Sequence, residues 1–204
     1  YVSDRDIYEL LNKDYSATGI RAFDYHFVSK VYEKPFELVY TPIEDFPKEL
    51  TQNVKCGGHT NGCRIGFDAG GSDRKVSAMK DGEVVYSEEV IWFPKITKDY
   101  KYHYEEILKA FKTAASYLPR VDAIGVSSAG IYINNRTMVA SLFMSINGED
   151  FNKHIKDIYI NVAKEIGDVP LVVANDGDVT ALAGAMELND NCVLGIAMGT
   201  SEAA

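Results

Sequence analysis

Residues 64–75 read Arg64-Ile-Gly-Phe-Asp68-Ala-Gly70-Gly71-Ser72-Asp-Arg-Lys75. An apolar run ends in the carboxylate of Asp68, a Gly-Gly-Ser turn follows, and a second apolar run begins at Val76. This pattern predicts a strand, a tight turn and a returning strand. In such a turn the missing Cβ atoms let backbone N–H groups converge on one point, which makes an anion-binding concavity. Because a carboxylate repels an anion, Asp68 is expected to hold a cation such as Mg²⁺ beside a bound phosphate.

The composition limits the classes of protein to consider. The chain has 204 residues, of which 46% are hydrophobic, which suffices for one core or for one domain and the start of another. No apolar run approaches the ~18 residues that a membrane span needs, and the first residues do not resemble a signal peptide. The net charge of −9 argues against general binding to nucleic acid or anionic membranes. Three cysteines favour reduced thiols and a cytoplasmic protein.

Residues 1–62 differ from the rest of the chain. Ser3 and Asp6 resemble a capping box before apolar residues at helical spacing, which predicts one helix. The stretch that follows is rich in aromatic and charged residues without a sustained period. Because so many aromatic residues argue against disorder, we expect an N-terminal extension that packs on the main domain.

From residue 63 onward the pattern becomes regular. Three antiparallel strands are expected first, with a type I′ turn at Asp81-Gly82, and helices then alternate with strands. The expected strands cover residues 64–69, 75–80, 83–91, 122–127, 170–174 and 192–197, and the expected helices cover 104–118, 151–166 and 179–188. This order predicts an α/β fold with a mixed sheet, in which ligands bind at the carboxyl ends of the strands.

Four motifs occur in a characteristic order along residues 64–204. They are Asp68–Lys75, the strand and turn at 123–130, the Asn-Asp-Gly segment within 173–187, and Leu194–Ser201. The first resembles a D-x-G-G-T-x-x-K phosphate motif, with Ser72 in place of threonine. In this order the motifs resemble the actin-like ATPase superfamily, and within it the ROK sugar kinases. The resemblance implies a ribonuclease-H-like mixed sheet forming the first lobe (63–190) of an actin-like kinase fold, with the start of a second lobe at 191–204.

The resemblance also implies roles for residues on the sugar side of a site. Asp176 corresponds to the general base that acts on the sugar hydroxyl. The residues implied to contact the sugar are Asn175, Ser128 and, more loosely, Asn147. Read without the family, Asn175-Asp176-Gly177 after a strand is also a good helix N-cap, and the Ser127-Ser128 pair is also explained as turn polarity.

On the nucleotide side, the resemblance implies ATP and Mg²⁺ as cofactors. Asp68 would position the metal ion. The residues implied to hold phosphates are Gly70, Gly71, Ser72, Lys75, Gly199 and Thr200. The second phosphate motif departs from the family, because glycines that should follow Gly199-Thr200 are missing and Glu202 adds negative charge.

These features predict ATP- and Mg²⁺-dependent phosphorylation of a sugar hydroxyl, completed by sequence outside these residues. The expected partners are a sugar and ATP, without nucleic acid or membrane, and a homodimer is compatible with the sequence. Two alternatives stay open. One is a non-catalytic sugar or nucleotide sensor of the same fold, which the altered second phosphate motif favours. The other is an activator-type ATPase that bridges a metal cluster between subunits.

Overall fold

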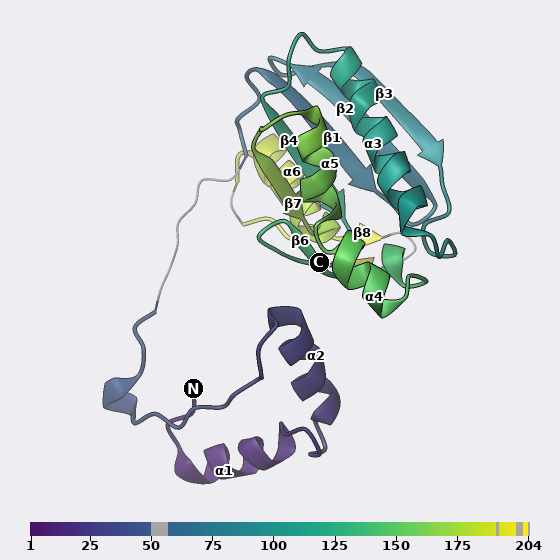
Figure 1. Ribbon diagram of the computed structural model, residues 1–204. Coiled ribbons are helices and arrows are strands. Elements are labelled where there is room, and N and C mark those ends of the chain that lie inside the picture. The colour runs from purple at the N-terminus through teal and green to yellow at the C-terminus, as the bar shows by residue number, and fades with distance from the viewer. Residues whose placement is uncertain (50–56, 191, 199–201, 204) are drawn as a thin grey trace. The chain divides into compact units, whose positions relative to one another are not determined.

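The computed structural model describes residues 1–49, 57–190, 192–198 and 202–203. The chain forms two compact units, Tyr1–Lys55 and Cys56–Ala204, which we call the N-terminal unit and the main unit (Figure 1). The division into 1–62, 63–190 and 191–204 remains a prediction. Within the described ranges, no helix has both the length and the apolar character that crossing a bilayer requires.

The N-terminal unit contains two α-helices, so the expectation of a single helix is wrong. These are α1 (Arg5–Asp14) and α2 (Ala22–Tyr32), followed by a 3₁₀ turn, η1 (Ile43–Asp45). The N-cap of α1 is Asp4 and not Ser3, since the Asp4 carboxylate accepts a hydrogen bond from the Ile7 N–H at 2.9 Å. The second helix was missed because its apolar and polar residues do not separate onto two faces.

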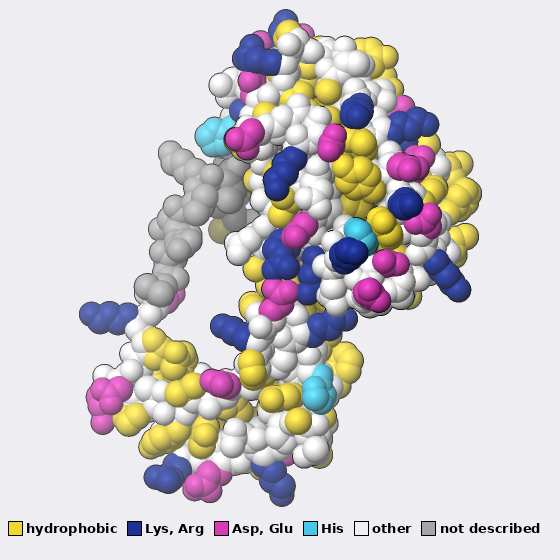
Figure 2. All heavy atoms as spheres, viewed as in Figure 1, with side chains coloured by type: hydrophobic (Ala, Val, Ile, Leu, Met, Phe, Trp, Pro, Cys, Tyr) yellow, Lys and Arg dark blue, Asp and Glu magenta, His cyan; other side chains and the backbone are white. Residues whose placement is uncertain are grey.

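Aromatic pairs connect the helices and loops of this unit. Tyr8 lies against Tyr40 and Tyr15 against Phe36, with ring centroids 5.9 and 5.8 Å apart. Val31 is the one buried hydrophobic side chain of residues 1–49, and Figure 2 shows hydrophobic side chains at the surface of the unit. The N-terminal unit therefore has a small core.

The main unit is built on a five-stranded sheet with the order β3-β2-β1-β4-β7 (Figure 1). The strands are β1 (Cys63–Ala69), β2 (Asp73–Lys80), β3 (Glu83–Ile91), β4 (Ala123–Ser128) and β7 (Leu171–Ala174). The turn between β2 and β3 has positive φ at both Asp81 and Gly82, as a type I′ turn requires.

Strand directions confirm the predicted mixed sheet. β2 is antiparallel to β1 and β3, whereas β4 is parallel to β1 and β7 is parallel to β4. The hairpin strands and the parallel strands thus share one sheet with β1 at its centre. This is the ribonuclease-H-like arrangement expected for the first lobe.

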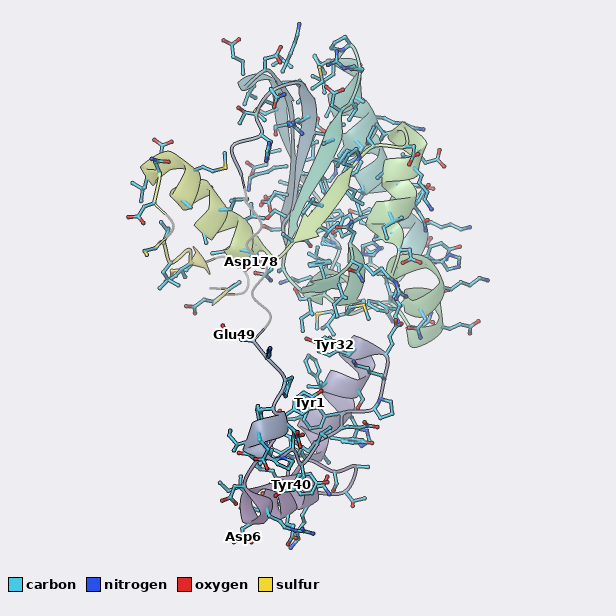
Figure 3. All side chains as sticks on the ribbon, turned by 90° about the vertical axis from the view of Figure 1, so that its left-hand side faces the viewer. Tyr1, Asp6, Tyr32, Tyr40, Glu49 and Asp178 are labelled. Carbon is cyan, nitrogen blue, oxygen red and sulfur yellow. The ribbon has the colours of Figure 1, made fainter. Side chains whose placement is uncertain are left out.

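Helices cover both faces of the sheet. α3 (Tyr100–Ser116) and α5 (Ile158–Ile166) lie on one face, and α6 (Asp176–Leu188) lies on the other (Figures 1 and 3). The core lies under α3 and α5, where alternate residues of β1 and β2 are buried against the helices. At its centre the rings of Phe67 and Phe111 meet edge to face with centroids 5.4 Å apart.

A hairpin that the sequence reading missed follows β4. It consists of β5 (Ile131–Ile133) and β6 (Arg136–Val139), joined by Asn134 and Asn135, both with positive φ. The Asn135 side chain accepts a hydrogen bond from Val173 N and donates one to the Leu171 carbonyl, both at 2.9 Å. It thereby satisfies backbone groups of β7 at the edge of the sheet.

The helix expected over residues 151–166 is divided in the structure. A turn, α4 (Gly148–Asp150), leads into a π-helical segment, η3 (Phe151–Ile155), and α5 begins only at Ile158. The Lys156 carbonyl accepts a hydrogen bond from Thr137 N of β6 at 2.8 Å. A tertiary contact therefore accompanies the break in the helical pattern.

The strand expected over residues 192–197 is also wrong. Residues 192–196 form neither helix nor strand, and the pairing is between two short strands, β8 (Ala197–Met198) and β9 (Glu202–Ala203). Gly195 packs directly on α6, because a Cβ atom there would lie 2.2 Å from Ala181 N. This segment is thus packed against a helix and not paired in the sheet.

Replacing Phe111 by Ala tests the core. Its side chain is fully buried, so we expect a loss of about 3–5 kcal/mol in the free energy of unfolding of the main unit. Urea unfolding followed by the fluorescence of Trp92, the one tryptophan in the chain, measures it. The matched control is Phe93→Ala, because Phe93 is 58% exposed and should lose less than about 1 kcal/mol. Equal losses in both variants would contradict the placement of the core.

Candidate functional site

The central strands place a row of polar side chains across the sheet. In the register, Asp68 of β1 lies opposite Lys75 of β2 on one side and Ser127 of β4 on the other. Ser127 in turn lies opposite Ala174, the last residue of β7. Residues directly opposite in a sheet point to the same face, with Cβ atoms about 4.5–5.5 Å apart. The first turn of α6 begins immediately after this row.

A cavity of about 440 Å³ opens over this row of residues. Described residues from six parts of the main unit line it: the end of β1, the turn and start of β2, the end of β4, the 3₁₀ turn η2 (Ser141–Phe143), the start of α6, and β8. The polar or charged lining residues are Asp68, Ser72, Asp73, Lys75, Ser127, Ser141, Asp176 and Thr180. Asp68 and Asp176, 108 positions apart in the sequence, thus face the same cavity.

The turn that closes β1 and β2 is held in place by its backbone. Gly70 cannot carry a side chain, because a Cβ atom would lie 2.6 Å from the Asp73 carbonyl oxygen. The indole N–H of the buried Trp92 donates to the Gly70 carbonyl at 2.8 Å, and its backbone N–H donates to the Ser72 carbonyl at 3.1 Å. Neither Gly70 nor Gly71 has a positive φ, so close packing and not left-handed backbone explains the requirement for glycine at Gly70.

Asp73 binds the two side chains of this turn that could donate to a phosphate. Its carboxylate accepts hydrogen bonds from Ser72 Oγ and from Lys75 Nζ, both at 2.8 Å. The hydrogen bond from Lys75, with that from Ser72, lowers the pKa of Asp73. The same bond to Asp73 raises the pKa of Lys75, and the charges of Glu89 and Asp68 add to it. Lys75 therefore stays protonated at neutral pH.

Asp176 lies at the first position of α6, beside the positive end of the helix dipole. Asn175 is the N-cap: its Oδ1 accepts from Gly177 N at 2.8 Å, and its Nδ2 donates to the Gly130 carbonyl at 2.9 Å. The Asn175 side chain thus orients the helix start against the turn after β4. It does not line the cavity, so the structure assigns it the N-cap role that the sequence left open.

Ser128 is placed away from the cavity. It is fully buried, and its hydroxyl oxygen accepts hydrogen bonds from Tyr132 at 2.7 Å and from Tyr159 at 3.3 Å. Burial raises the pKa of Tyr159 to about 12 and raises the pKa of Tyr132 well above its usual value. These two phenols stay neutral, and they connect β5 and α5 beneath the carboxyl end of β4.

Of the other predicted contacts, Asn147 does not line this cavity. Asn147 is an exposed N-cap of α4, and its Oδ1 accepts from the N–H groups of Glu149 and Asp150. Gly199 and Thr200 lie outside the described residues, although Ala197 and Met198 just before them line the cavity.

The alternation of side chains along β4 is the signal that would have identified Ser127. Ile124 and Val126 are core residues, so Ser128 shares their buried face and Ser127 shares the opposite face with Asp68. Asp73 was overlooked although it lies inside the quoted motif. Ser141 begins the 3₁₀ turn η2 after β6, and nothing in its local sequence indicates a place at the cavity.

The carboxylates of the cavity could bind Mg²⁺ only together with a ligand that supplies further oxygen atoms to the metal ion. Among the described residues, no group of three or more His, Cys, Asp or Glu side chains could hold a metal ion. Mg²⁺ is commonly bound through one or two carboxylates together with phosphate oxygens and water. Asp68, at the centre of the row, fits that mode of binding.

Titration of Tyr159 provides a test of this buried network. Its pKa is raised to about 12 from 10.0, so its contribution to stability is complete below pH 10 and is lost as the pH rises from 10 to 12. Between pH 9 and pH 11 the wild type should lose about 1 kcal/mol more than Tyr159→Phe, which cannot ionise there. Urea unfolding followed by circular dichroism measures the difference, with exposed Tyr117→Phe as the control. A parallel pH dependence in wild type and Tyr159→Phe would contradict the burial of this phenol.

Comparison with known proteins gives matches among solved structures alone. No protein-family model matches the chain, and no curated protein is similar enough in sequence to count as a match. The inorganic polyphosphate/ATP-glucomannokinase from Arthrobacter sp. strain KM is 21% identical, with 61% of this chain and 48% of that chain covered and a TM-score of 0.46. The glucokinase from Parabacteroides distasonis is 21% identical, with 60% and 33% covered and a TM-score of 0.47.

A regulator appears beside the kinases. A ROK family transcriptional regulator, a homologue of the E. coli MLC protein, is 20% identical, with 62% of this chain and 31% of that chain covered and a TM-score of 0.41. The chain thus spans less than half the length of these structures. The strand order and strand directions define the fold of the main unit. Among solved structures, this fold is similar to sugar kinases and regulators of the ROK type.

Proposed function

We propose that the main unit is the phosphate- and sugar-binding lobe of a ROK-type sugar kinase, which transfers phosphate from ATP to a sugar hydroxyl. One observation carries this proposal: Asp68, the turn at residues 70–72, Lys75 and Asp176 all line one cavity at the carboxyl ends of the parallel strands. Phosphoryl transfer depends mainly on positioning and on charge stabilisation, and this set of side chains can supply both.

Each proposed role follows from position. Asp176, at the start of α6, would accept a hydrogen bond from the sugar hydroxyl and orient it towards the phosphate. Lys75 and the N–H groups of the turn would hold phosphate oxygens, and Asp68 would hold Mg²⁺. When bound, Mg²⁺ neutralises phosphate charge. Ser127, between Asp68 and the end of β7, faces the same space and would add a hydroxyl contact.

The proposed partners are ATP and a sugar, and the proposed location is the cytoplasm. Against nucleic-acid binding, residues 1–55 carry ten Asp and Glu and seven Lys and Arg, and Figure 2 shows both charges interspersed over the face of α3 and α5. Because the N-terminal unit contains two helices, α1 and α2, its helix content gives no argument against a DNA-binding role. The proposed assembly is a homodimer.

A second candidate is a sensor that binds sugar or nucleotide without catalysis. It is favoured by the hydrogen bonds of Asp73, which occupy Ser72 and Lys75. Sugar binding without phosphate transfer in the natural protein would select the sensor.

Replacing Asp176 by Asn tests the kinase proposal. Phosphate transfer from Mg·ATP to a panel of hexoses and N-acetylhexosamines should fall about 10²- to 10⁴-fold, while calorimetric sugar affinity changes by only a few fold. Asp178→Asn is the matched control, because Asp178 belongs to the same first turn of α6 (Figure 3) but is exposed and does not line the cavity. Full turnover by the Asp176 variant would refute its role as general base.

A further inference from the structure

The cavity is acidic, which is unfavourable for a site that is to bind phosphate. Among the described residues that line it, Asp68, Asp73 and Asp176 carry carboxylates, and Lys75 carries an ammonium group. A phosphate entering this cavity therefore meets three negative side chains. Asp68 and Asp176 have roles in the proposed function, whereas Asp73 has none.

Asp73 competes directly for the hydrogen-bond donors of the loop. Its two carboxylate oxygens are used separately: Oδ1 accepts from Lys75 Nζ, and Oδ2 accepts from Ser72 Oγ. Asp73 and Lys75 are two positions apart on β2, so their side chains point to the same face of the sheet. The carboxylate thus occupies the donors that a phosphate would use.

The fold of the loop does not depend on this carboxylate. Gly70 packs on the backbone carbonyl of Asp73, and Trp92 holds the carbonyls of Gly70 and Ser72. Both Asp73 and Lys75 are partly exposed, with side-chain exposures of 24% and 50%. An exposed ion pair of this kind contributes little to stability. The side chain of Asp73 can therefore be changed without loss of the turn.

We propose that Asp73 is an internal competitor of phosphate: it holds Ser72 and Lys75 in the free protein, and phosphate binds only by displacing its carboxylate from them. Asp73 is thus a residue that determines the affinity of this loop for phosphate groups. The inference rests on the proposed function, since it concerns the phosphate end of the same cavity. By this competition, the side chain of Asp73 limits the affinity of the chain for nucleotides.

Binding of sodium tripolyphosphate to the full chain tests the inference. Measured by calorimetry without divalent ions, the affinities of Asp73→Ala and Asp73→Asn should exceed that of the wild type by about three- to tenfold. The matched control is Glu89→Gln, because Glu89 lies opposite Lys75 in the register and acts on it through its charge, outside the cavity lining. That variant should bind within about twofold of the wild type.

A double-mutant cycle identifies the donors. In a Lys75→Met background, the gain in tripolyphosphate affinity from Asp73→Ala should shrink, because one of the released donors is then absent.

If Asp73→Ala binds tripolyphosphate no more tightly than the wild type while Lys75→Met binds it more weakly, the competition is refuted and the phosphate site stands. Weaker binding of Mg·ATP by Asp73→Ala would make Asp73 a metal-binding group and also refute the competition. Absence of tripolyphosphate and Mg·ATP binding in every variant would overturn both the inference and the proposed phosphate site.

Discussion

The pairing of β1 with two different neighbours is the constraint on which the site depends. Because β1 is antiparallel to β2 and parallel to β4, a single register brings Lys75, Asp68 and Ser127 together on one face of the sheet. The parallel pairing of β4 with β7 then directs the chain into α6 at the same edge. Asp176 reaches the cavity for this reason, without any local sequence relation to Asp68.

The opposite face of the same strands supplies the rigidity that a positioned site requires. Phe67 of β1 packs against Phe111 of α3, and the phenols of Tyr132 and Tyr159 meet at Ser128 below the end of β4. Side chains alternate along a strand, so each core residue fixes the direction of its polar neighbour. The buried network and the cavity thus lie on opposite faces of the same strands. Asp73 adds a competing negative charge on the cavity side.

Much of the fold could be predicted from local patterns. The β2–β3 hairpin followed from Asp81-Gly82, and α3 and β7 followed from their apolar periodicity and length. The site could be predicted in part: Asp68, Lys75 and Asp176 were placed in one cleft by motif order, whereas Ser128 was chosen instead of Ser127. The errors at residues 151–157 and 192–196 share one cause, because backbone groups there make tertiary contacts that no local pattern encodes.

The sequence by itself determined which residue types stand at the strand ends, because strand periodicity and turn chemistry are local properties of the chain. Only the tertiary structure decided which of these residues share a cavity and which become caps. Asn175 and Asn147 satisfy backbone N–H groups at helix starts, a demand that arises only when those helices form where they do. By contrast, the contact of Asp73 with Lys75 follows from the local sequence, because residues two positions apart on a strand point to the same face.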